Sequence, residues 1–153
     1  MNNKLEERKL VFKNQLIQNT DEFIIDLLSK IKKQLLITDP AFNSFILKYL
    51  HFVKKDVQIF IVLPSSCYDK NRIDYYSQIG VKANYLIDDE IKDNFLIIDK
   101  EKTYILGVAT NTGEETLIIQ KFIDPYIGDI ILKKYHLKKS VNYIRVAGSN
   151  CGL

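Results

Sequence analysis

The chain has 153 residues, of which 46% are hydrophobic and 27% charged, values typical of one folded domain with a sizeable core. No apolar run approaches the ~20 residues that span a bilayer, and the first residues lack the pattern of a secretory signal. These features exclude a spanning helix and predict a cytoplasmic protein without membrane contact. The net charge is +3 over residues 1–60, −4 over 61–120 and +4 over 121–153. A solvated surface is the main interpretation of this distribution, and a footprint for nucleic acid is the alternative.

The cysteines and histidines are few and widely spaced. Cys67 and Cys151 are the only cysteines, and without a secretory signal they are typical of free thiols in a reducing compartment. The two histidines, His51 and His136, have no ligand spacing relative to them. We therefore expect no metal site and no cofactor.

The N-terminal residues 1–33 are predicted to form a helical extension. Apolar residues recur at helical spacing over residues 4–18, with a basic outer face. A second apolar stripe covers residues 23–31 and ends among Lys30, Lys32 and Lys33, where cations suit the helix dipole. The two predicted helices could pack on their own sheet or supply part of a subunit interface, and the sequence favours neither.

A parallel α/β sheet is predicted for the next part of the chain. Short apolar runs bounded by turn residues indicate strands, and apolar residues at helical spacing indicate the helices between them. The expected strands cover residues 34–38, 57–63 and 81–87, and the expected helices cover 42–53 and 69–79. This strand–helix alternation with short links is typical of parallel sheets.

The pattern then changes to an antiparallel meander. Three strands are expected at residues 95–98, 103–109 and 116–119, with turns at 100–102 and 111–113. A closing helix is predicted over residues 123–135, and residues 141–146 alternate as an edge strand or a docking tail would. The predicted fold is thus α/β with a mixed sheet. It comprises a helical extension (1–33), an α/β domain (34–140) and a C-terminal strand or tail (141–153).

The predicted strand order over residues 34–135 resembles that of a single repeat of the phospholipase D-like superfamily. The stretch Ile37-Thr38-Asp39-Pro40-Ala41-Phe42 is similar to that family's first strand and the start of its first helix. The family's chemistry depends on a motif His-x-Lys-x4-Asp followed by Gly-Ser-x-Asn. In that motif the histidine attacks a phosphodiester, while the lysine and asparagine bind phosphate oxygens.

The catalytic side chains of that motif are missing here. Counting back from Asp99, the histidine position falls on Lys92 and the lysine position on Asn94. Downstream, Gly107 matches, but the serine and asparagine positions fall on Val108 and Thr110. A lysine amine is a poor nucleophile near neutral pH, and an asparagine cannot neutralise an anion. The resemblance therefore implies the fold and argues against the activity.

We accordingly predict a non-catalytic binding, regulatory or assembly module, with Lys92, Asn94, Asp99, Gly107 and Thr110 as candidates to line a cleft. The resemblance also implies a homodimer, and it is compatible with a nucleic acid or a small polar ligand as partner. The competing hypothesis is a phosphodiesterase or nuclease with a non-standard active site. A plain receiver-like or flavodoxin-like scaffold is a third hypothesis, against which the meander strands argue.

Three further groups of residues are candidate sites. Ser65 and Ser66 follow a strand's carboxyl end, where open α/β sheets bind ligands, but an ordinary loop is the stronger interpretation. The acidic residues 88–90 could bind a hard cation, although such runs are more often solvated. His51 and His136 each end a predicted helix, where a histidine usually stabilises the helix dipole.

Overall fold

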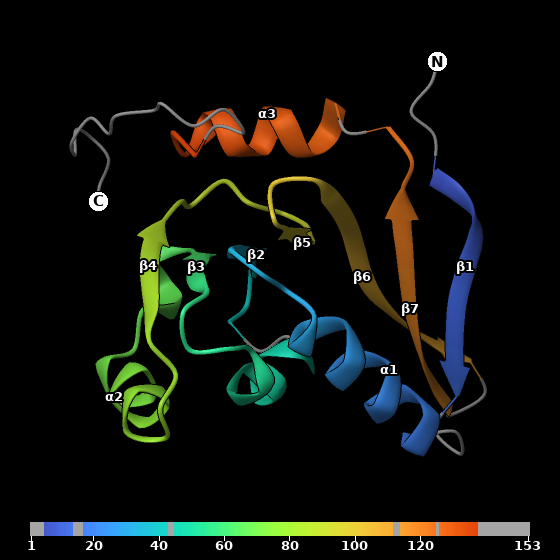
Figure 1. Ribbon diagram of the computed structural model, residues 1–153, viewed down its shortest axis with the longest axis horizontal. Coiled ribbons are helices and arrows are strands. Elements are labelled where there is room, and N and C mark those ends of the chain that lie inside the picture. Colours follow the sequence, from blue (N-terminus) through green and yellow to red (C-terminus); the bar gives the residue numbers. More distant parts are fainter. Residues whose placement is uncertain (1–4, 14–16, 43–44, 112–113, 125, 138–153) are drawn as a thin grey trace.

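A seven-stranded mixed sheet forms the centre of the molecule in the computed structural model, with strand order β1-β7-β6-β5-β2-β3-β4 (Figure 1). The structure describes residues 5–13, 17–42, 45–111, 114–124 and 126–137. Side chains are described for residues 21–42, 46–107, 118–124 and 126–137. The predicted mixed α/β fold is confirmed.

The parallel half consists of β2 (Gln34–Thr38), β3 (Gln58–Leu63) and β4 (Ala83–Ile87). Strand β2 is buried along its whole length, because it lies between β5 and β3 and is covered on both faces. Continuous apolar strands of this kind are typical of parallel sheets with two covered faces. All three strands therefore begin at one end of the sheet and finish at the other, which fixes where their flanking loops lie.

The antiparallel half consists of β5 (Asn94–Ile98), β6 (Lys102–Asn111), β7 (Glu114–Phe122) and β1 (Leu5–Lys13). A tight turn joins β5 to β6. Its central residues Asp99 and Lys100 have φ values of 54° and 61°, and the N–H of Glu101 donates to the carbonyl of Ile98 at 2.9 Å. Two positive φ values in succession are typical of the turns that best match the twist of a hairpin. The predicted hairpin is confirmed, with its turn one residue earlier than expected.

Helices cover both faces of the parallel half (Figure 1). On one face lie α1 (Ile17–Ser29), the 3-10 helix η2 (Phe45–Phe52) and α2 (Lys70–Gln78). On the other lies α3 (Tyr126–Lys134). The larger core lies on the first face and includes Ile24 and Leu28 of α1, whereas the smaller core places Leu132 of α3 against β2, β3 and β5.

The helix expected over residues 4–18 is wrong. Residues 5–13 form the edge strand β1, which pairs antiparallel with β7, for example Leu10 with Ile119. The run Leu10-Val11-Phe12 favours a strand, and pairing with a distant strand overrides the helical spacing around it. The second predicted helix is confirmed as α1, which packs on its own sheet.

The helix expected over residues 42–53 is wound as a 3-10 helix, although Phe42, Ile46, Leu50 and Val53 enter the core as predicted. The strand or tail expected at residues 141–146 lies outside the described residues, as do Thr112 and Gly113 of the second expected turn. In the part of the chain that the structure describes, no helix is long and apolar enough to cross a membrane.

Candidate functional site

The five motif positions, Lys92, Asn94, Asp99, Gly107 and Thr110, are called the degenerate motif. It begins where β5 meets the carboxyl end of β2. The side-chain amide of Asn94 donates to the carbonyl of Thr38 at 2.7 Å. The hydroxyl of Thr38, a residue only 3% exposed, donates to the carbonyl of Asp93 at 2.7 Å and accepts the N–H of Phe95 at 2.9 Å. Asn94 thus joins two strands, while Lys92 is exposed beside it.

Asp99 lies at the opposite end of β5. It follows Asn94 by five residue positions, a distance of roughly 16 Å along the strand. Its carboxylate accepts the backbone N–H groups of Lys33 at 2.6 Å, Gln34 at 3.0 Å and Lys32 at 3.1 Å. Although burial opposes ionisation, these three donors hold the pKa of Asp99 below its ordinary value. The carboxylate therefore fastens the α1–β2 connection to the β5–β6 turn.

The two downstream motif positions lie on β6. Gly107 is next to Leu106, the partner of Asn94, so the fold brings Gly107 and Asn94 close together. Thr110 lies three residues further along β6, opposite Glu115 of β7, and its side chain is outside the described part. The five candidate positions are therefore not one constellation, because Asp99 is at the far end of the sheet.

The carboxyl end of the parallel strands is acidic. Both donors of Ser65 in η3 (Ser65–Cys67), its N–H and its hydroxyl, are taken by one oxygen of Asp89, at 2.7 Å and 2.8 Å. Asp88, next to it, accepts from Lys134 at 2.7 Å and from the hydroxyl of Tyr135. Burial opposes ionisation of Asp88, but its hydrogen bonds hold its pKa below the ordinary value. Negative charge at this end disfavours an anionic ligand.

The remaining predicted groups stand apart from the motif. Ser66 is exposed, as are both histidines. His51 lies in the last turn of η2, where its ring packs against that of Phe52 with centroids 4.2 Å apart. His136 follows α3 and has a φ of 62°. Within the described residues, no group of three His, Cys, Asp or Glu side chains is placed to hold a metal ion.

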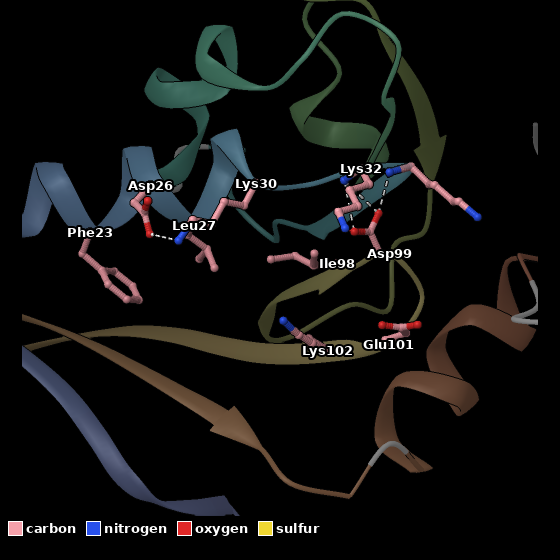
Figure 2. A pocket seen from close by; sticks show the side chains of 10 residues that line it. Phe23, Asp26, Leu27, Lys30, Lys32, Ile98, Asp99, Glu101 and Lys102 are labelled. Atoms are coloured by element: carbon pink, nitrogen blue, oxygen red, sulfur yellow. Dashed lines mark hydrogen bonds and ion pairs between the residues drawn. The ribbon is translucent and has the colours of Figure 1, made fainter.

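Two hollows open at the other end of the sheet, where the parallel strands begin. The larger, of about 550 Å³, lies between α1 and the β5–β6 hairpin. Figure 2 shows the apolar side chains of Phe23, Leu27 and Ile98 directed into it, with Lys102 reaching in from β6. The smaller, of about 250 Å³, has a floor that includes Val57 and Ile59 of the β3 region.

Lysines surround both hollows. The strand register places the residues before β2, β3 and β4 at the same end of the sheet as the β5–β6 turn, since Gln34 pairs with Gln58, Ile59 with Ala83 and Leu35 with Ile98. Seven lysines flank these strand ends and are called the lysine rim: Lys32, Lys33, Lys54, Lys55, Lys82, Lys100 and Lys102. Sequence reasoning assigned several of them to helix ends and turns. The signal it missed is that lysines precede each of the three parallel strands.

The chain is similar to known proteins in its fold only. No protein-family model matches the sequence, and no curated protein does. Among solved structures, the chain is similar to NucT from Helicobacter pylori, with 14% identity over 84% of this chain and 92% of that one and a TM-score of 0.53. A second match is TrmBL2, an archaeal chromatin protein described as showing a novel mode of DNA binding, with 18% identity and a TM-score of 0.47. That match covers 84% of this chain but only half of TrmBL2.

Proposed function

We propose that this chain is a non-catalytic domain of phospholipase D-like fold that serves as a binding module. The main observation in its support is the hydrogen bond that the side-chain amide of Asn94 donates to the carbonyl of Thr38, which joins β5 to β2. This bond uses one of the two N–H donors of the amide and fixes the side chain toward β2, and an uncharged amide cannot neutralise a phosphate. The motif's aspartate is likewise occupied, since Asp99 accepts three backbone N–H groups.

The chemistry of the neighbouring positions supports the same proposal. Phosphodiester cleavage through a covalent intermediate needs a nucleophile and a cation facing the same phosphate. Here an exposed lysine stands at the nucleophile position, and the carboxyl end of the sheet carries Asp88, Asp89 and Asp93. Asp88 is paired with Lys134, whereas the carboxylates of Asp89 and Asp93 disfavour a bound phosphodiester. The fold likeness to NucT supports the α/β architecture and does not bear on activity.

Turnover of bis(p-nitrophenyl) phosphate and of plasmid DNA tests the proposal. We expect no turnover above that of a mock preparation from the same expression host. The variants Lys92→Ala, His51→Ala and His136→Ala serve as controls, because each removes one candidate nucleophile from an exposed position. Turnover by the unmodified chain that disappears in one of these variants would establish an enzyme and refute the proposal.

The same resemblance implies that two copies pair. Sedimentation equilibrium distinguishes a 17.8 kDa monomer from a dimer of twice that mass. We expect the dimer. A single species at the monomer mass over the whole accessible concentration range would contradict this part of the proposal and leave the binding role unaffected.

A further inference from the structure

The charged side chains of the described residues are distributed unevenly along the strand direction. The lysine rim occupies the end where β2, β3 and β4 begin, and six of its seven lysines are exposed, Lys100 being half-buried. The other end carries the acidic residues that follow β4 and precede β5, namely Asp88, Asp89, Glu90 and Asp93, together with the exposed Lys92 and with Lys134, which pairs with Asp88 at 2.7 Å. A surface of one sign at one end of a domain attracts partners of the opposite sign to that end.

Few acidic side chains compete for the rim. Asp99 already accepts three backbone N–H groups, and the charge of Lys32 acts on it as well. Asp26 pairs with Lys30 at 3.0 Å, so that pair contributes little net charge. In the described part of the rim, Asp99 keeps its negative charge and Asp56 and Glu101 are exposed carboxylates, so three acidic groups stand against seven lysines. The rim therefore keeps an excess of positive charge.

The lysines follow a line across five strands. From β6 through β5, β2 and β3 to β4 there are four strand spacings of about 4.8 Å each, so the rim is roughly 19 Å long. A small anion would use only part of such a row. A chain of phosphates spaced along a backbone can meet lysines at each strand in turn.

The hollows distinguish between kinds of polyanion. The larger has an apolar floor of Phe23, Leu27 and Ile98 (Figure 2), and the smaller is bounded by Lys54, Lys55 and Lys82. An unstacked base has apolar faces that fit such hollows and can stack on an aromatic ring. A duplex keeps its bases paired and stacked inside, whereas a flexible single strand can turn them toward the protein.

We propose that the lysine rim binds single-stranded nucleic acid, with phosphates along the lysines and bases in the two hollows. This inference rests on the proposed binding function and locates it at the end of the sheet opposite the motif positions Lys92, Asn94 and Gly107. Recognition by charge and stacking depends little on sequence. The ligand class is thus a single-stranded oligonucleotide of any composition.

Fluorescence anisotropy with a labelled oligothymidine of about 12 nucleotides tests this, since single-strand binders cover sites of about that size. Two double variants remove two rim charges each: Lys32→Gln with Lys33→Gln, and Lys54→Gln with Lys55→Gln. Single strands lose affinity with a slope of about −0.7 in log K against log salt for each phosphate contact. We expect each double variant to bind more weakly and to reduce the slope by about 1.4, twice the single-contact value.

A matched control removes the same charge elsewhere. Lys70→Gln with Lys133→Gln changes exposed residues on α2 and α3, and we expect an unchanged slope. Lys92→Gln probes the end with the degenerate motif. The proposal would be overturned if Lys92→Gln bound more weakly while the rim variants kept the affinity of the parent. It would also be overturned if the control lost as much affinity as the rim variants. Circular dichroism of every variant verifies the fold.

Competing oligonucleotides separate the ligand classes. We expect an abasic oligomer of the same length and a blunt duplex to compete less well than the single strand. Equal competition by the abasic oligomer would mean that the bases are not bound, and tighter binding of the duplex would refute single-strand preference. The oligonucleotide recovered afterwards, run on a denaturing gel, reports on the proposed function separately. An intact product with rim-dependent binding supports both proposals, and a cut product refutes only the non-catalytic one.

Discussion

Replacing Asp99 tests whether the motif's aspartate is structural. Its carboxylate accepts three backbone N–H groups, of which that of Gln34 belongs to a residue only 4% exposed. An unsatisfied buried donor costs about 1–3 kcal/mol, while water can replace the acceptor at the exposed Lys32 and Lys33 at smaller cost. Asp99→Gly should therefore lower the free energy of unfolding by about 2–3 kcal/mol.

Asp99 also has a φ of 54°, a region that costs residues other than glycine, asparagine and aspartate about 1–2 kcal/mol. Asp99→Ala should thus lose about 1 kcal/mol more than Asp99→Gly. Asp99→Asn should lose least, because it keeps an acceptor oxygen and tolerates this backbone conformation. Urea unfolding followed by circular dichroism measures all three. An Asp99→Gly variant within ~0.5 kcal/mol of the parent would refute the structural role, since changes of that size are usual at uninvolved surface positions.

Three further predictions concern packing, hydrogen bonding and pH. A methyl group at Gly128 of α3 would collide with the hydroxyl of the buried Thr103, so Gly128→Ala should destabilise the protein by about 1–3 kcal/mol. In a Thr103→Ala background the same substitution should cause no loss of stability, as measured by thermal unfolding. The side-chain nitrogen of Gln34 is buried without a partner among the described residues. Gln34→Met should therefore raise the free energy of unfolding by about 1 kcal/mol. A decrease of that size in urea titrations would contradict this prediction. Because the folded-state pKa values of Asp88 and Asp99 lie below the ordinary value of about 3.9, their stabilisation is complete above it and declines as the pH falls through the folded values. Unfolding midpoints from pH 6 to pH 2, a range of about four units around that value, should fall less steeply in Asp99→Asn.

The sequence was most informative where a segment's local pattern and its final environment agree. The runs that became β2 and β3 are apolar because both of their faces are covered, and this produces a pattern that can be recognised locally. Residues 5–13 are different, because their strand form depends on pairing with β7, more than a hundred residues away. Helical spacing of a few apolar residues cannot reveal such a partner.

The candidate site was predictable only in part. Spacing alone placed Lys92, Asn94 and Asp99 on one motif, and the structure locates Asn94 and Asp99 at opposite ends of β5. Their hydrogen bonds run to backbone groups of residues 32–38, and no local pattern specifies these partners. The lysine rim was equally hidden, since its members are scattered between residues 32 and 102 and come together only through strand order.

The two ends of the sheet differ in role: internal hydrogen bonds hold the carboxyl end, and the lysine rim at the amino end is the proposed binding surface for single-stranded nucleic acid. Amide chemical shifts of isotope-labelled protein, followed while single-stranded oligothymidine is added, report on both ends in one titration. We predict shifts concentrated at the lysine rim, around residues 32–34, 54–58, 82–83 and 100–102. Shifts concentrated instead at residues 92–95 and 107, with the rim unchanged, would contradict the proposed binding at the lysine rim.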